Sequence, residues 1–66
     1  MKHLFINGEQ REIEAASLEA LFSELGLPAP LLLVEYNGKA LTRSEWQTVV
    51  LAEEDRLELM AVAAGG

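Results

Sequence analysis

Two Asn-Gly dipeptides, Asn7-Gly8 and Asn37-Gly38, lie on either side of the chain's one strong helical pattern. Asn-Gly is well suited to a two-residue hairpin turn, because both central residues need a positive φ. Each dipeptide follows a short apolar segment, so each predicts a strand that reverses direction. A single helix between two such hairpins must pack across one sheet, which restricts the chain to a small α+β fold.

The strands follow from apolar alternation. Leu4 and Ile6 share one face of the first strand with Phe5 on the other, and residues 10–14 form the return strand. Residues 31–36 are nearly all apolar, which predicts a central strand buried on both faces. A short strand at residues 39–41 follows the second turn. In the last strand Leu57, Leu59 and Ala61 alternate with Glu58, Met60 and Val62.

The helix is bounded on both sides. Its apolar stripe has helical spacing and consists of Leu18, Leu21, Phe22 and Leu25. Ser17 is suited to cap the first turn, and Gly26 with Pro28 ends the helix. A second helical turn is predicted at residues 43–47, capped by Ser44 and anchored by Trp46.

Size and charge exclude several classes of protein. With 66 residues and 50% hydrophobic side chains, the chain forms one domain with its own core. It has no cysteine, so it has no disulfide, thiolate metal site or cysteine nucleophile. A net charge of −6 argues against nucleic-acid binding and fits docking onto a basic protein surface. No apolar run is long enough to span a membrane, so we expect a cytoplasmic monomer.

The element order is ββαββ, which is the pattern of the ubiquitin-like β-grasp: a mixed sheet of four or five strands with one packed helix. We expect a β-grasp domain over residues 1–62 and a flexible diglycine tail over residues 63–66. Gly65-Gly66 ends this tail. Glycine has no Cβ, so the tail can enter a channel too narrow for other side chains. A protein whose terminal carboxylate is the reacting group needs such an end.

The chain resembles the ThiS family, the ubiquitin-like sulfur carrier proteins of bacterial thiamine biosynthesis. The resemblance spans the whole chain. The segments that carry it are Asn7-Gly8-Glu9, Ser17-Leu18, Leu21-Phe22, Leu25-Gly26, Glu35-Tyr36-Asn37-Gly38, Arg43-Ser44-Glu45-Trp46, the turn at 51–55 and Gly65-Gly66. The chain departs from the family pattern in three places: Thr42 replaces a frequent proline, Glu54 replaces a glycine, and Ala63-Ala64 precede the diglycine where relatives often carry another glycine. Glu54 must therefore avoid positive φ or accept strain.

The resemblance implies a carrier with no catalytic residue, no metal and no bound cofactor. An E1-like adenylyltransferase of the ThiF type would use ATP to adenylate Gly66. A sulfur donor such as a cysteine desulfurase would then supply sulfur for a terminal thiocarboxylate. Thiazole synthase of the ThiG type would receive that sulfur.

The same use explains the tail, because Ala63, Ala64 and Gly65 would thread into each partner in turn. We expect docking through the sheet face away from the helix. The candidate docking residues are Phe5, Tyr36, Met60 and Val62, each of which alternates with a predicted core position.

Other functions remain open at the level of sequence. The sulfur could serve molybdopterin or another sulfur-containing metabolite, although the short chain and the Arg43-Ser44-Glu45-Trp46 segment favour thiamine. A ubiquitin-like modifier conjugated through Gly66 would share the activation chemistry. A passive interaction domain would not need the tail at all.

Overall fold

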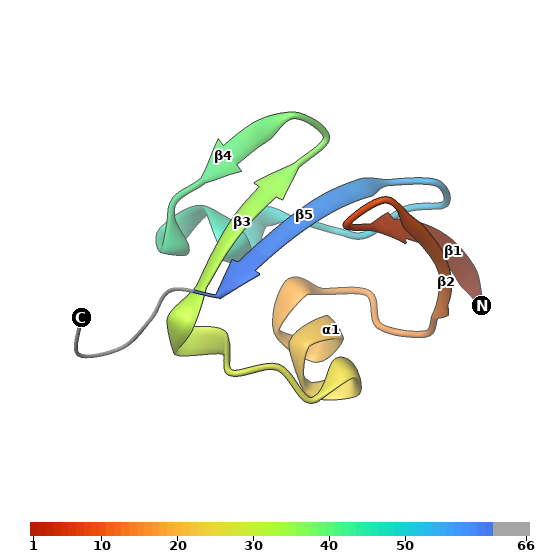
Figure 1. The fold of residues 1–66 in the computed structure, drawn as a ribbon, viewed down its shortest axis with the longest axis horizontal. Coiled ribbons are helices and arrows are strands. Elements are labelled where there is room, and N and C mark those ends of the chain that lie inside the picture. Colours follow the sequence, from red (N-terminus) through yellow and green to blue (C-terminus); the bar gives the residue numbers. More distant parts are fainter. Residues whose placement is uncertain (62–66) are drawn as a thin grey trace.

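The computed structural model describes residues 1–61, apart from the side chain of Pro30. It contains one five-stranded sheet with a single α-helix against one face (Figure 1). The elements in chain order are β1 (Lys2–Ile6), β2 (Glu9–Ile13), α1 (Leu18–Leu25), η1 (Ala29–Leu31), β3 (Leu32–Tyr36), β4 (Lys39–Leu41), η2 (Arg43–Thr48) and β5 (Arg56–Ala61). The sequence prediction of a ubiquitin-like β-grasp is confirmed, with five strands rather than four.

The last strand lies in the middle of the sheet. The strand order is β2-β1-β5-β3-β4, with β1 and β5 parallel and every other neighbouring pair antiparallel. Both predicted hairpin turns form, with Asn7 and Gly8 at φ 52° and 83° and Asn37 and Gly38 at 49° and 86°. Because β5 lies between the two hairpins, the described part of the chain ends at Ala61 in the central strand of the sheet.

Helix α1 begins and ends where the sequence predicts. The Ser17 hydroxyl accepts a hydrogen bond from the Ala20 N–H, and Gly26 takes a left-handed conformation at φ 69°. The Leu27 N–H then donates to the Phe22 carbonyl at 2.8 Å, which satisfies a carbonyl of the last turn. A single face of α1 is therefore held against the sheet.

The core lies between α1 and the sheet, and the loop before β5 closes one end of it. Its buried members are Leu4, Ile6, Ile13, Ala15, Leu18, Leu21, Phe22, Leu32, Val34, Trp46, Val49, Leu51 and Leu57. Trp46 meets Phe22 edge-on, with ring centroids 5.1 Å apart. The apolar members from β1, β3 and β5 all belong to the face that α1 covers.

Two sequence predictions about this region were wrong. The β3 strand is buried on one face only: Leu32 and Val34 are buried, whereas Leu33 is 57% exposed. The reason is that α1 covers one side of the sheet and the described part of the chain places no element on the other. The 3-10 helix η2 is capped by Thr42 rather than Ser44, since the Glu45 carboxylate accepts from the Thr42 N–H at 2.8 Å.

Candidate functional site

The candidate site is the place where the chain leaves the sheet. Strand β5 ends at Ala61, which is paired in register with Leu32 at the start of β3. The predicted tail residues Ala63, Ala64, Gly65 and Gly66 lie outside the described residues, as does Val62. Their roles as the modified end and the threading segment therefore stay predictions. The structure does define the surface from which they depart.

The predicted docking residues divide between two faces of the sheet. Phe5 and Met60 lie on the open face, away from α1, because Leu4, Ile6 and Leu57 turn to the core. Tyr36 has the same orientation as Val34 and packs against the core cluster. Its assignment to the open face was wrong, because Tyr36 lies two positions after the buried Val34 and therefore on the same face of the strand.

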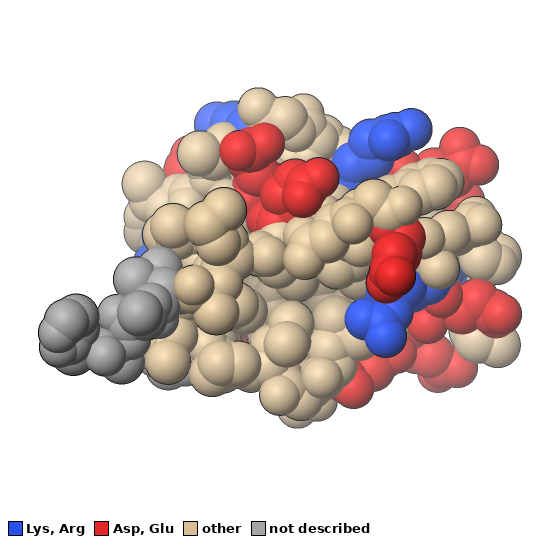
Figure 2. Space-filling model, in the orientation of Figure 1, with Lys and Arg blue, Asp and Glu red and all other residues tan. Residues whose placement is uncertain are grey.

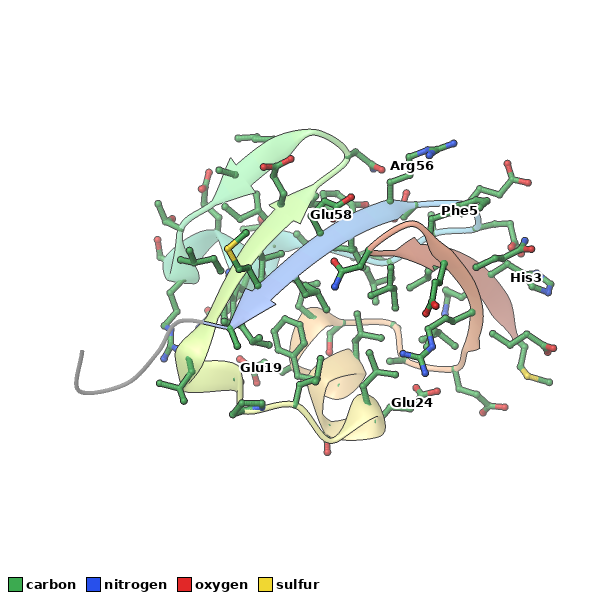
Figure 3. All side chains as sticks on the ribbon, in the orientation of Figure 1. His3, Phe5, Glu19, Glu24, Arg56 and Glu58 are labelled. Carbon is green, nitrogen blue, oxygen red and sulfur yellow. The ribbon has the colours of Figure 1, made fainter. Side chains whose placement is uncertain are left out.

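Phe5 and Met60 are also far apart on that face. Phe5 is in register with Arg56 at the start of β5, whereas Met60 is one residue from its end. Four residues of extended strand separate them by about 13 Å. The Arg56 guanidinium lies over the Phe5 ring, 4.9 Å from its centroid. Figure 3 shows Arg56 and Glu58 projecting from β5 away from α1, with Phe5 beside Arg56.

The open face near the end of β5 contains three residues that sequence reasoning missed: Leu33, Glu35 and Glu58. In the register of β3 and β5, Leu33 is opposite Met60 and Glu35 is opposite Glu58. A groove of about 240 Å³ runs between these strands and β4. The sequence did contain a signal for this exposed face. Glu35 follows an apolar run in the predicted strand, and a carboxylate at such a position indicates a face exposed to water.

Tyr36 has a structural role at the opposite end of β3. Its hydroxyl donates to Asp55 at 2.6 Å, and Asp55 also accepts from the Asn37 side chain and the Ala52 N–H. The hydrogen bond to Asp55, with burial and the charge of that carboxylate, raises the pKa of Tyr36 to about 12. The phenol is therefore neutral at physiological pH and serves as a fixed donor.

The acidic turn before β5 is less freely solvated than its sequence suggests. The Glu53 carboxylate accepts from the His3 N–H at 2.6 Å and lies 3.0 Å from the His3 ring nitrogen Nδ1. Asp55 accepts three hydrogen bonds, so of the three acidic residues in this turn only Glu54 has no side-chain partner among the described residues. This turn anchors the start of β5 to β1 and β3.

A second hollow lies on the opposite side of the molecule, between α1, η1 and η2. Its volume is about 490 Å³, and Arg43 and Trp46 line it. The Arg43 guanidinium stacks on the indole at 5.1 Å and donates to the Ala29 carbonyl at 3.1 Å. Arg43 therefore ties η2 to η1.

Residues 1–61 contain neither a cluster of three metal-ligating side chains nor a helix able to cross a membrane. No three histidine, aspartate or glutamate side chains of this part come together as a ligand set. None of its helices has both the length and the apolar character needed to cross a membrane.

A five-stranded mixed sheet on one helix, with the last strand in the centre, defines a ubiquitin-like β-grasp protein. The model of the ThiS family matches residues 4–66. The chain therefore belongs to the ThiS family, the small sulfur carrier proteins of thiamine biosynthesis.

One solved structure and several known proteins are similar to this chain. The fold matches the crystal structure of the thiamine biosynthesis protein ThiS from Geobacter metallireducens with a TM-score of 0.79 and 26% identity, over 97% of this chain and 99% of that one. Thiazole synthases of Paramagnetospirillum magneticum and Magnetococcus marinus are 38% and 34% identical over 64 residues, 96% of this chain. The chain spans only about a fifth of their length (20% of each). An uncharacterized protein, ycf40, of Trieres chinensis is 26% identical over 98% of this chain and 90% of its own length.

Proposed function

We propose that this protein carries sulfur as a thiocarboxylate on Gly66 and delivers it to thiazole synthase. The observation that carries the proposal is the family match, which runs through the diglycine to residue 66. The architecture supports it, because β5 is the central strand and the residues after Ala61 continue from a well-held position. A carboxylate five residues after the end of this strand can be presented to an enzyme without unfolding the domain.

Activation of Gly66 requires an ATP-dependent step, because a carboxylate is a poor electrophile. In this proposal an E1-like adenylyltransferase binds the tail, and a carboxylate oxygen of Gly66 attacks the α-phosphorus of ATP. Pyrophosphate leaves and an acyl-adenylate remains. The terminal sulfur of a persulfide, supplied by a cysteine desulfurase, then attacks the acyl carbon and displaces AMP. A second thiol attacks the resulting S–S bond, forms a disulfide and releases the thiocarboxylate.

Thiazole synthase is the proposed acceptor. Two proteins with that name contain a segment similar to this chain, and this segment is about a fifth of their length (20% of each). In this proposal the sulfur passes from Gly66 to the acceptor. We place this exchange in the cytoplasm, with the carrier monomeric between partners.

The direct test is the intact mass of the protein after incubation with ATP, a sulfur donor and the activating enzyme. We expect a shift equal to the replacement of one oxygen by sulfur, and its absence when Gly66 is deleted. An unchanged mass, with an enzyme that is active on another carrier, would exclude the sulfur-carrier function for that enzyme. Isopeptide-linked adducts in cells would instead favour the modifier function.

The tail also predicts the effect of a point substitution. Gly65→Val adds a β-branched side chain next to the reacting end, so we expect at least about a hundredfold loss of adenylation rate with the fold intact. ATP–pyrophosphate exchange measures the rate, and the far-UV circular dichroism spectrum checks the fold. Ala64→Gly is the matched control, because it keeps the tail narrow and should retain activity. A folded Gly65→Val variant with the wild-type rate would contradict the threading role.

A further inference from the structure

The open face beside the end of β5 combines two carboxylates with two exposed apolar side chains. Glu35 and Glu58 are directly opposite on β3 and β5, and Leu33 and Met60 form the next outward-facing pair toward the chain exit. Leu33 is 57% exposed and Met60 is 67% exposed. Figure 2 shows acidic side chains on this side of the sheet, bordered by uncharged surface that continues toward the end of β5.

The carboxylates have no cationic partner in the part of the chain that the structure describes. Its two ion pairs join His3 to Glu53 and Lys39 to Glu45. The nearest cation along β5 is Arg56, which is engaged over the Phe5 ring and makes no ion pair with Glu58 within 4 Å. Like charges directly opposite on neighbouring strands destabilise a sheet. The pair therefore does not help the isolated fold.

These four residues lie within reach of the tail. Glu58 is three residues before Ala61, about 10 Å along the strand, and the five residues from Ala61 to Gly66 extend at most about 17 Å. An enzyme that takes Gly66 into its active site therefore approaches this end of the sheet. If that enzyme adenylates Gly66, it binds ATP and needs cationic groups near the triphosphate. A carrier that approaches with a negative surface complements such a rim.

We propose that Glu35 and Glu58 together receive an arginine of the activating enzyme, while Leu33 and Met60 pack against an apolar side chain beside that arginine. Arginine suits the position because its planar guanidinium has donors on two edges and can engage two carboxylates at once. The apolar pair excludes water from one side of the contact and so strengthens it. This inference deepens the proposed function and rests on its adenylation step.

The test compares two double variants of the full-length chain, each of which removes two negative charges. Glu35→Gln/Glu58→Gln removes the acidic pair. Glu12→Gln/Glu19→Gln is the matched control, because both side chains are exposed and lack side-chain hydrogen bonds in the described structure. Glu12 is on the far edge strand β2, and Glu19 is on α1. Calorimetry without ATP measures the Kd for the activating enzyme at low and high salt, and steady-state adenylation gives KM and kcat.

We expect Glu35→Gln/Glu58→Gln to raise both Kd and KM about tenfold, with kcat unchanged and a weaker salt dependence. The control variant should change Kd less than about twofold. Leu33→Ala/Met60→Ala should weaken binding but keep the salt dependence. Urea unfolding should show that the Glu35→Gln/Glu58→Gln variant is at least as stable as the wild type, so that weaker binding cannot come from unfolding.

Equal effects of the two glutamine variants would overturn the inference, because net charge alone would then explain binding. An unchanged KM in a carrier that is adenylated normally would overturn the docking surface and leave the sulfur-carrier function standing. If the wild-type chain binds the enzyme through the acidic pair but is never adenylated, the docking surface would stand and the sulfur-carrier function would be overturned. Absence of any binding by the wild type would overturn both.

Discussion

At the scale of single residues, Asp55 connects more of the structure than any other carboxylate in the described part. It accepts from the Tyr36 hydroxyl at 2.6 Å, the Ala52 N–H at 2.8 Å and the Asn37 side chain at 3.2 Å. Burial by itself would raise the pKa of Asp55. The three hydrogen bonds outweigh burial and hold that pKa below its ordinary value.

Asp55→Asn should therefore lower the free energy of unfolding by about 1–3 kcal/mol at pH 7. Because the folded pKa is depressed, the carboxylate stabilises the fold above its unfolded pKa near about 4, and this contribution is lost as the pH falls through the folded value. Urea unfolding at pH 7 and pH 3, followed by Trp46 fluorescence, measures both effects. An equally steep acid dependence in Asp55→Asn would show that another group is responsible.

Tyr36→Phe provides the complementary comparison. It removes one of the three hydrogen bonds to Asp55, so we expect about half the loss seen for Asp55→Asn. The pKa of Tyr36 is raised to about 12, so its contribution is complete below the unfolded value of about 10 and is lost as the pH rises from there through 12. The phenylalanine variant should therefore lack this loss of stability between pH 10 and 12.

At the scale of elements, the turn into β5 contains a conformation that glutamate rarely adopts. Glu54 has φ 68°, so of the two alternatives at this departure from the family's glycine the turn takes the positive φ. Glu54→Gly should raise the free energy of unfolding by about 0.5–1 kcal/mol. Glu54→Ala is the control, because it removes the charge and keeps the Cβ. A similar gain from both variants would point to relief of charge repulsion with Glu53 and Asp55.

The two Asn-Gly turns show what local sequence can and cannot predict about an element. Both turns and their positive φ angles were predicted from the dipeptides. The Asn7 side chain also accepts from the Leu59 N–H at 2.7 Å and donates to the Leu59 carbonyl at 3.1 Å. Asn37 similarly accepts from the Arg56 N–H at 2.8 Å. These contacts depend on β5 lying between the hairpins, which local pattern does not determine.

The same limit explains which residues of the candidate site the sequence predicted and which it missed. Alternation placed Phe5 and Met60 on the open face correctly, because each neighbours a core leucine or isoleucine. It failed in β3, because an apolar run does not reveal that only one side of the sheet is covered. Leu33 and Glu35 thus became visible as surface residues only with the strand order. A surface made by residues of two strands needs their register as well as their periodicity.

At the scale of the whole molecule, the buried core of residues 1–61 extends from Leu4 to Leu57. Among these described residues Leu59 is partly buried against the core, and β5 is paired as far as Ala61. Deletion of residues 63–66 should therefore change the free energy of unfolding by less than about 0.5 kcal/mol, the range of surface changes. The same deletion should abolish adenylation and thiocarboxylate formation.

Thermal and urea unfolding measure the first effect, and intact mass measures the second. Replacing residues 63–66 with four alanines is the useful control, because it restores length without the terminal glycines and should also be inactive. A marked loss of stability on deletion would show that the tail packs on the domain and that residues 1–62 are not the folding unit. If the truncated protein still allows a thiamine-requiring host to grow without added thiamine, the tail is dispensable and a passive interaction domain would be favoured instead. Stability without activity is the result expected of a carrier whose fold and reacting group are separate parts of one chain.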